Sequence, residues 1–269
     1  MKKIIALMTD YGYKDPYVGV LKGVIKSINP DAEIIDLTHG VERHNILEAT
    51  VMLAVSARYF PRNTIFVVVV DPGVGGERKS IVIETNNYIL VGPDNGCLSL
   101  LAEIDGIKRV FDVSNSRYRL PVVSSTFHGR DIFAPVAAWI SRGIPLEEIG
   151  VELKPDEIVR MKIEKPRVDL ENRVVEASIL YIDVYGNIMT NIDESLLQQV
   201  KPALWSSIQI SNYSRVYECK YVPSFSWVRE GELACYINSW GYFEIAVFKG
   251  DASRLLGVRQ GERLKLKFS

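Results

Sequence analysis

Three short polar segments interrupt apolar stretches of this chain, and their residue types could do chemistry. They are Thr9–Gly12, Val70–Arg78 and Thr126–Asp131. The second follows an uninterrupted apolar run, Phe66–Val70, which is typical of a strand buried on both faces of a parallel sheet. Ligands of such sheets bind at the carboxyl ends of the strands, so we expect a site where this run ends in Asp71.

The loop that begins at Asp71 ends at Arg78, so it carries a negatively charged carboxylate at one end and a positively charged guanidinium at the other. Its three glycines would let the backbone approach a ligand closely. The spacing matches neither a Walker loop nor the dinucleotide fingerprint, so it does not predict a phosphate-binding loop. A surface loop closed by a salt bridge is the structural alternative, and such a bridge would contribute little stability.

Two more carboxylates and a histidine are candidates. Asp10 follows the expected strand 4–9 and has no evident structural role, whereas Asp15 precedes Pro16 and is equally well explained as a helix N-cap. An ionised carboxylate at a strand end suits ribose hydroxyls, because it only accepts hydrogen bonds. His128 begins an expected helix and is the best candidate for a proton acceptor, because the ordinary pKa of histidine lies near neutrality.

The remaining histidines and the cysteines give no clear metal pattern. His39 and His44 have no carboxylate-rich motif near them, so no metal is expected. Three widely spaced cysteines predict buried free thiols rather than a disulfide framework or a zinc site, namely Cys97, Cys219 and Cys235. The default compartment is therefore a reducing cytoplasm.

Composition excludes several classes of function. The chain has 269 residues, 47% of them hydrophobic and 24% charged, and a formal net charge of −1. Neither nucleic acid nor an anionic membrane surface is an expected partner, because there is no basic stripe. The apolar N-terminus begins like a signal peptide but is too short before Asp10, so we expect it to be a first buried strand. No segment approaches the length of a membrane span.

Apolar periodicity predicts an α/β domain followed by an all-β domain. In the first part we expect strands at 4–9, 33–37, 64–70, 80–85, 88–91 and 108–113, with helices at 15–28, 45–59, 98–104 and 131–142. In the second part we expect strands at 173–182, 205–210, 215–221, 233–237, 242–248 and 263–268. The predicted organisation is an α/β domain with a mostly parallel sheet and flanking helices (1–152), a linker (153–170) and a barrel-like all-β domain (171–269).

Two turns of the second domain combine amides, a carboxylate and aromatic rings. They are Ile182–Asn187 and Asn238–Tyr242. Aromatic faces together with amide edges suit a purine ring. Hairpin-turn chemistry is the alternative explanation, and each motif is weak alone.

Taken in order, six motifs resemble one family. They are Thr-Asp-Tyr-Gly, Asp-Pro-Gly-Val-Gly, Gly-Pro-Asp-Asn-Gly, Thr-Phe-His-Gly-Arg-Asp, Asp-x-Tyr-Gly-Asn and Asn-Ser-x-Gly-Tyr. The set resembles the S-adenosylmethionine hydroxide adenosyltransferases, which are adenosine-forming hydrolases related to the fluorinase and chlorinase. The resemblance runs from residue 4 to the C-terminus. It implies an α/β domain, a barrel-like domain, and homotrimers whose active sites lie between the first domain of one subunit and the second domain of its neighbour.

The resemblance also implies a reaction. The catalytic Asp–Arg–His set of the hydrolases falls on Asp71, Arg78 and His128. The halogenating relatives have a tyrosine in place of Asp71 and lack this histidine arrangement, so the chain resembles the water-using branch. S-adenosylmethionine is then the substrate, and no cofactor is expected. No metal is needed, because the leaving methionine develops no negative charge.

The resemblance further implies the substrate-binding residues. Asp10 would bind the ribose. Ser239 and the stretch from Glu244 to Val247 would line the far side of the site from the neighbouring subunit. The full set is Asp10, Asp15, Asp183, Tyr185, Asn187, Ser239, Glu244 and Val247. The fluorinase has an arginine where Trp240 stands here, so recognition of the methionine carboxylate is left open.

Three other functions are weighed against this one. A halide-using relative is disfavoured, because the Asp71 carboxylate would repel a bound halide. A non-catalytic sensor of S-adenosylmethionine or adenosine is disfavoured by the complete Asp71, Arg78 and His128 set. A nucleic-acid-binding barrel is disfavoured by the near-zero net charge.

Overall fold

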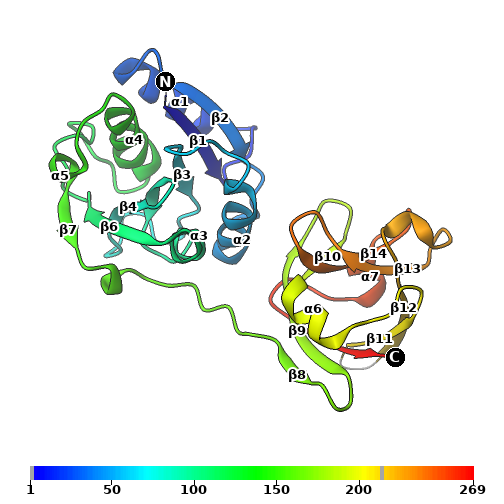
Figure 1. Ribbon diagram of the computed structural model, residues 1–269. Coiled ribbons are helices and arrows are strands. Elements are labelled where there is room, and N and C mark those ends of the chain that lie inside the picture. The colour runs from blue at the N-terminus through cyan, green and yellow to red at the C-terminus, as the bar shows by residue number, and fades with distance from the viewer. Residues whose placement is uncertain (1–2, 213–214) are drawn as a thin grey trace. The chain divides into compact units, whose positions relative to one another are not determined.

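The chain forms two compact units, 1–162 and 163–269, in a computed structural model that describes residues 3–212 and 215–269 (Figure 1). Each unit has its own hydrophobic core. Met1 and Lys2, which begin the leader-like segment, lie outside the described residues. The α/β and all-β classes expected from the sequence are both confirmed.

The first unit is built on one mixed sheet. Its strands are β1 (Ile4–Thr9), β2 (Glu33–Thr38), β3 (Ile65–Val69), β4 (Ser80–Thr85), β5 (Ile89–Pro93), β6 (Ile107–Asp112) and β7 (Val151–Leu153). The strand order is β2-β1-β3-β5-β4-β6-β7. The first four strands in that order pair in parallel, and β4, β6 and β7 pair antiparallel after the expected hairpin at 86–87.

Helices cover both faces of this sheet. They are α1 (Tyr17–Ile28), α2 (Ile46–Ala57), α3 (Ser99–Asp105), α4 (Ala134–Ser141) and the short α5 (Leu146–Ile149). Alternate residues of β3 point to opposite sides: Val67 packs in the core with α1 and α4, and Phe66 packs in the core with α2 and α3. Burial on both faces explains why the run from residue 66 to 70 has no polar position.

Two helix starts differ from expectation. The N-cap of α1 is Pro16, and no side chain caps this helix, so the N-cap interpretation of Asp15 is wrong. Pro16 already has helical backbone angles, which leaves Asp15 one residue too early to cap and exposed to solvent. The helix expected at 131–142 begins earlier, as a π-helical turn over Gly129–Phe133 that continues into α4.

The stretch expected to be a linker, 153–170, contains ordered structure at both ends. β7 ends within it, and the chain after β7 is fastened to the first unit through Val159 N–H donating to Asp94 Oδ1 (2.8 Å) and Met161 N–H donating to Ser99 Oγ (2.9 Å). Its last part forms β8 (Arg167–Asp169), which pairs with the barrel.

The second unit is a closed barrel. Its strands are β9 (Val174–Ile182), β10 (Ile188–Asp193), β11 (Ser207–Asn212), β12 (Arg215–Tyr221), β13 (Leu233–Ile237), β14 (Tyr242–Val247) and β15 (Arg263–Phe268). The order β10-β14-β13-β12-β11-β15-β9 closes through a β9–β10 pairing, and β8 is added beside β9. The sequence did not predict β10 or the short helices α6 (Glu194–Val200) and α7 (Ala252–Leu256).

The cysteine prediction is wrong at two positions. Cys219 of β12 and Cys235 of β13 form a disulfide inside the barrel core, while Cys97 is free and buried as expected. The disulfide joins two neighbouring parallel strands, and the two cysteines are 16 residues apart in the sequence. That spacing alone does not indicate that β12 and β13 are neighbours in the barrel. Cysteine usage therefore no longer points to a reducing compartment.

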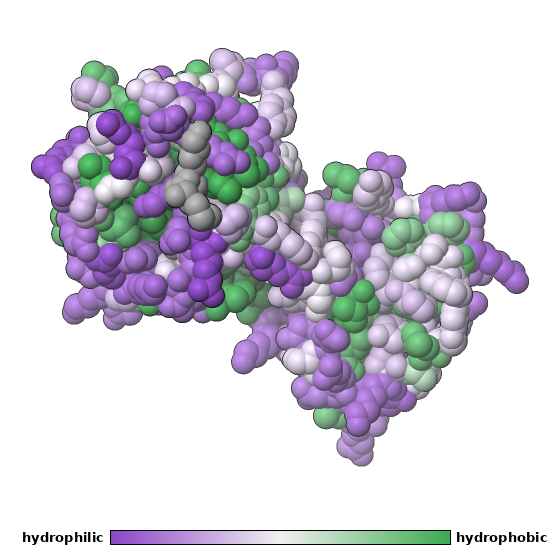
Figure 2. Space-filling model, turned by 45° about the horizontal axis from the view of Figure 1, so that its top comes forward, coloured by the Kyte–Doolittle hydropathy of each residue, from purple (hydrophilic) through white to green (hydrophobic). Residues whose placement is uncertain are grey.

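The helices are too short or too polar to be membrane spans. Among residues 3–212 and 215–269, no helix combines the length and apolarity needed to cross a bilayer. The face drawn in Figure 2 mixes hydrophilic residues with small groups of hydrophobic ones.

Removing the disulfide tests its contribution to stability. We expect the double variant Cys219→Ala/Cys235→Ala to lose about 3 kcal/mol of unfolding free energy, because the disulfide closes a short loop in the unfolded chain. Urea denaturation with and without reductant measures this. Reductant should destabilise the wild type and leave the double variant unchanged. Equal stability of the oxidised and reduced wild type would contradict the prediction.

Candidate functional site

Two of the candidate carboxylates lie at the point where the strand order reverses. The chain passes from β1 to β2 on one side, and β3 then pairs with the other side of β1. Thr9 is opposite Val69 in that pairing, so Asp10 and Asp71 follow the carboxyl ends of neighbouring parallel strands. Ligands of open α/β sheets bind at such switch points.

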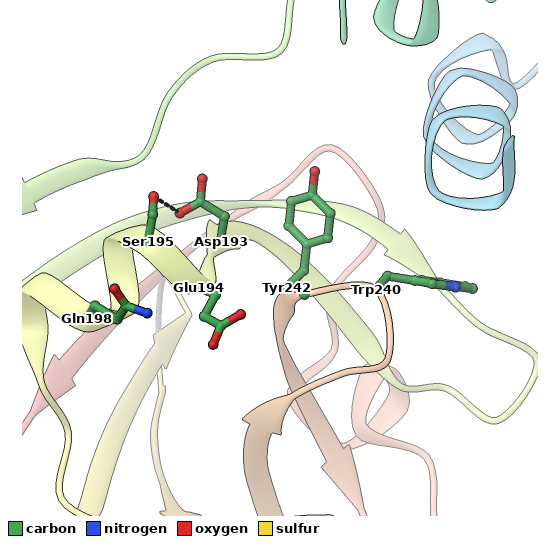
Figure 3. A pocket seen from close by; sticks show the side chains of 7 residues that line it. Asp193, Glu194, Ser195, Gln198, Trp240 and Tyr242 are labelled. Atoms are coloured by element: carbon green, nitrogen blue, oxygen red, sulfur yellow. Dashed lines mark hydrogen bonds between the residues drawn. The ribbon is translucent and has the colours of Figure 1, made fainter. Parts of the chain in front are cut away.

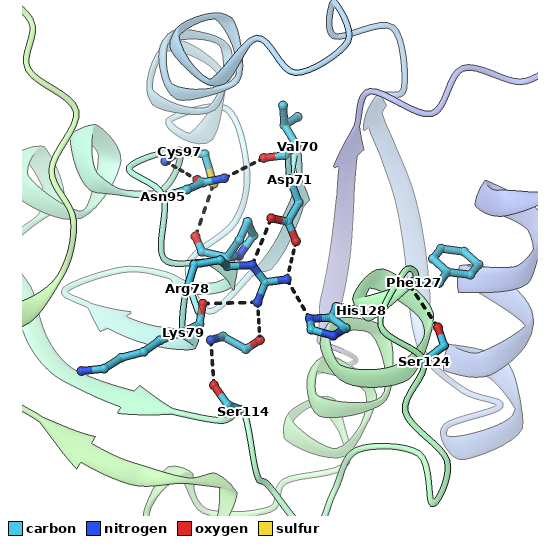
Figure 4. Close-up of polar contacts among 12 residues, drawn as sticks. Val70, Asp71, Arg78, Lys79, Asn95, Cys97, Ser114, Ser124, Phe127 and His128 are labelled. Carbon is cyan, nitrogen blue, oxygen red and sulfur yellow. Dashed lines mark hydrogen bonds and ion pairs between the residues drawn. The ribbon is translucent and has the colours of Figure 1, made fainter. Parts of the chain in front are cut away.

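Asp71 is held in a buried, two-pronged ion pair by Arg78 (Figure 4). Arg78 Nε donates to Asp71 Oδ1 at 3.0 Å, and Arg78 Nη2 donates to Asp71 Oδ2. The two side chains are only 5% and 10% exposed, so the surface salt bridge weighed above does not describe this pair. Arg78 Nη1 also donates to Ser80 Oγ at 2.9 Å, and the guanidinium lies 5.4 Å from the centre of the Phe133 ring.

The same guanidinium sets the tautomer of His128. Arg78 Nη2 lies 2.8 Å from His128 Nδ1. An arginine can only donate, so Nδ1 is the acceptor and the proton of the neutral ring is on Nε2. Burial, and then the charge of Arg78, lowers the pKa of His128 below its usual 6.5. In this arrangement neither ring nitrogen is free to take a proton.

The loop of Asp71 packs against the segment that carries His128. Gly75 has φ of +76°, and a Cβ there would lie 2.0 Å from the carbonyl oxygen of Ser125, so only glycine fits. Buried Asp131 shapes the same segment by accepting from Ser124 N–H at 2.8 Å. The second and third polar segments are thus brought into contact.

All three polar segments border one cavity of about 390 Å³. This volume is in the range of small-molecule sites. Residues from each segment line it, among them Asp10, Tyr11, Asp71, Val74, Thr126 and Gly129, and Asp15 lies at it too. Arg78 contacts both Asp71 and His128, and neither Arg78 nor His128 is among the residues that line the cavity.

Sequence reasoning placed Tyr11 in a candidate segment without giving its side chain a role, and it assigned no role at this cavity to Tyr17, Arg43 or His44. Burial, followed by the charges of Asp10 and Asp71, raises the pKa of Tyr11, so its hydroxyl stays protonated. The Tyr17 ring lies 5.4 Å from that of Tyr11 and 5.2 Å from that of Phe127. Arg43 and His44 follow β2, so the rule that placed Asp10 at a strand end could have found them.

In the barrel, Asp183 and Asn187 build the turn between β9 and β10. Asp183 Oδ1 accepts from the backbone N–H groups of Tyr185 and Asn187, each at 2.9 Å, and Asp183 Oδ2 accepts from Asn187 Nδ2 at 2.9 Å. The Tyr185 side chain is exposed. The turn interpretation therefore holds for Asp183.

Ser239, Glu244 and Val247 lie on or beside β14. Glu244 is buried, and it accepts from the Tyr236 hydroxyl at 2.5 Å and from Asn238 Nδ2 at 2.7 Å. Burial raises the pKa of Glu244. Because β10 and β14 are antiparallel, the 183–187 turn lies towards the Val247 end of β14 and the Ser239 turn lies at its other end.

A second hollow lies on the barrel beside the turn that carries Ser239 (Figure 3). Trp240 and Tyr242 border it on one side, and Asp193 and Ser195 of the α6 start border it on the other. Asp193 is accounted for as the N-cap of α6, since it accepts from Leu196 N–H and Ser195 Oγ. Among the described residues, no group of three or more His, Cys, Asp or Glu side chains could hold a metal ion.

Comparison with family models decides the family. The model of the SAM hydroxide adenosyltransferase N-terminal domain matches residues 5–150, and that of the C-terminal domain matches residues 177–265. The chain belongs to the SAM hydroxide adenosyltransferase family. The two matched regions fall within the two structural units.

Individual relatives agree with this assignment. The chain is 39% identical to an (R)-S-adenosyl-L-methionine hydrolase of Methanocaldococcus jannaschii, over 95% of this chain and 92% of that protein. It is 28% identical to a fluorinase of an Actinoplanes species, over 90% of each chain. A crystal structure of an uncharacterised conserved protein from Thermotoga maritima superposes with a TM-score of 0.92 at 40% identity, covering 98% of this chain and 99% of the other.

Proposed function

We propose that this protein is an enzyme that hydrolyses S-adenosyl-L-methionine to adenosine and L-methionine. The observation that carries the proposal is the hydrogen-bonded Asp71–Arg78–His128 set, whose Asp71 lines the cavity at the sheet's switch point. Similarity to hydrolases over nearly the whole chain supports it. A water oxygen bonds to C5′ as the C5′–S bond breaks, the bonding pair moves to sulfur, and methionine leaves as a neutral thioether.

The structure suggests how the three residues divide the work. The sequence favoured His128 as the proton acceptor, but Arg78 occupies its Nδ1 lone pair. We assign the proton of the attacking water to the Asp71 carboxylate, which lines the cavity. Arg78 aligns Asp71, and His128 aligns Arg78. No step needs a metal, since the leaving sulfur gains no negative charge.

Substrate recognition is proposed to involve both units. Asp10 accepts from the ribose hydroxyls, and Asp15 lies at the same cavity. Asp183, Tyr185, Asn187, Ser239, Glu244 and Val247 come from the barrel of a neighbouring subunit in a homotrimer. Of these, Glu244 acts by holding Asn238, whose Nδ2 donates to Glu244 Oε2 at 2.7 Å.

The products of turnover test the reaction. Purified protein is incubated with each sulfonium epimer of S-adenosyl-L-methionine, with and without chloride and EDTA, because relatives are named for the (R) epimer. We expect adenosine and methionine from at least one epimer, unaffected by EDTA, and no product from Asp71→Ala. A halogenated nucleoside would assign the protein to the halide-using branch. Bound substrate without product would support a sensor.

His128 variants test the division of labour. Asparagine can accept from Arg78 but cannot titrate, so we expect His128→Asn to keep most activity and His128→Ala to lose about tenfold or more. Protonation of His128 removes the lone pair that Arg78 uses, and its pKa is lowered, so wild-type kcat should fall only below pH 6.5. That acid limb should be absent in His128→Asn. If His128→Asn is as inactive as His128→Ala, His128 is the base.

Mixing inactive variants tests the shared site. Asp71→Ala impairs the first unit and Asn187→Ala impairs the barrel, so the Asp71→Ala homotrimer should be inactive and the Asn187→Ala homotrimer weakly active. When the two are unfolded, mixed in equal amounts and refolded together, about a quarter of the sites in closed rings should carry both intact halves. We expect activity to return accordingly, and light scattering to give a trimer mass. No recovery in mixed trimers would place each site within one chain.

A further inference from the structure

We propose that His39 is a positioning residue for the substrate site: it holds the Thr9–Gly12 turn so that the Asp10 carboxylate faces the cavity. The inference rests on the proposed function, in which Asp10 binds the ribose. His39 does not line the cavity. It acts through the turn that carries Asp10.

His39 is buried between two polar partners. Its side chain is 0% exposed, its Nδ1 lies 2.8 Å from Thr9 Oγ1, and its Nε2 lies 3.1 Å from Asp36 Oδ1. At that separation Nε2 and Asp36 Oδ1 are within ion-pair distance, but neither atom makes a well-directed hydrogen bond to any residue that the structure describes. Thr9 and Asp36 are thus the polar groups that face the two ring nitrogens, which accounts for a histidine that the sequence left without a role.

The charges around Asp36 set the direction of this chain of contacts. Lys22 Nζ and the Tyr13 hydroxyl donate to Asp36 Oδ2 at 2.7 and 3.0 Å. Burial raises the pKa of Asp36, but the hydrogen bonds from Lys22 and Tyr13 and the nearby His39 outweigh it, so the net pKa is lowered and Asp36 is ionised. An ionised carboxylate only accepts, so Nε2 is the nitrogen that carries a proton towards Asp36, and in the neutral ring Nδ1 then accepts from the Thr9 hydroxyl.

The other end of the chain of contacts reaches the turn itself. Thr9 Oγ1 still has a lone pair, and the Tyr11 backbone N–H donates to it at 3.2 Å. The next backbone N–H, that of Gly12, donates to the His39 carbonyl oxygen at 2.8 Å. Gly12 has φ of +65°, so the chain turns sharply there. Both amides that follow Asp10 are thus fixed by Thr9 and His39.

The consequence falls on Asp10. Its Oδ2 accepts from His44 N–H at 2.9 Å, which leaves Oδ1 for a ligand in the cavity. A carboxylate binds a hydroxyl well only when its direction is fixed, because otherwise ordering it costs part of the binding energy. Breaking the Thr9–His39 contact should therefore weaken binding of the ribose hydroxyls while leaving the adenine contacts in place.

Two substitutions of His39 in the full-length protein separate its two side-chain contacts. His39→Asn keeps an acceptor near the Nδ1 position, so Thr9 retains its partner. His39→Gln reaches the Nε2 position, so it keeps only the Asp36 contact. Titration calorimetry with adenosine and with 2′,3′-dideoxyadenosine then measures the contribution of the ribose hydroxyls, with Asp10→Ala as reference.

We expect the wild type to bind adenosine about tenfold more tightly than the dideoxy analogue, since hydroxyl bonds to a carboxylate are charge-assisted. His39→Asn should keep that ratio, and His39→Gln should reduce it towards the ratio of Asp10→Ala. With S-adenosylmethionine, His39→Gln should raise KM more than it lowers kcat. If folding of the His39 variants is impaired, Thr9→Val and the hydroxyl-bearing control Thr9→Ser make the same comparison.

The outcomes distinguish this inference from the proposed function. A wild-type ratio in His39→Gln and Thr9→Val would overturn the positioning role, and so would a wild type that binds both nucleosides equally. The wild type could also fail to hydrolyse S-adenosylmethionine and yet prefer adenosine to the dideoxy analogue. If His39→Gln then lost that preference, the positioning role would be upheld and the hydrolase activity rejected.

Discussion

The site depends on one buried ion pair, that between Asp71 and Arg78. A charged pair this little exposed is stable only if each partner keeps its hydrogen bonds, and breaking it would leave an uncompensated buried charge. Arg78 meets this condition by also donating to Ser80 and His128. The loop between the two residues must therefore return the chain to β4 with Arg78 facing β3. The close packing of Gly75 on Ser125 is part of that constraint.

The position of the pair follows from the sheet. β1 and β3 are parallel neighbours, and both end at the same edge, so the first polar residues after each strand meet there. The apolar core on both faces of β3 makes the strand end the first place where a charge is tolerated. The third polar segment, Thr126–Asp131, contains the start of a π-helical turn, which begins at Gly129 directly after His128. Wide turns of this kind are frequent at functional sites.

Local patterns revealed much of this arrangement, and non-local pairing limited the rest. The run before Asp71 identified a doubly covered strand, and the strand-end rule placed Asp10 beside it. Asp15 was misread because a proline can itself occupy the cap position. The Cys219–Cys235 disulfide depends on β12 and β13 becoming neighbours, and nothing near either cysteine indicates that pairing. The tautomer of His128 depends in the same way on the distant Arg78, since 50 residues separate them.

The charge balance of the set favours water over a halide as the nucleophile. Arg78 is permanently cationic, Asp71 offsets that charge at hydrogen-bonding distance, and His128 is neutral at pH 7 because burial and Arg78 lower its pKa. The set therefore presents no net positive charge to an incoming anion, and a halide would meet the carboxylate that lines the cavity. A water molecule has no such penalty, because it can donate to the carboxylate that repels the halide. In the proposed mechanism, the same Asp71 that binds Arg78 would also select the nucleophile.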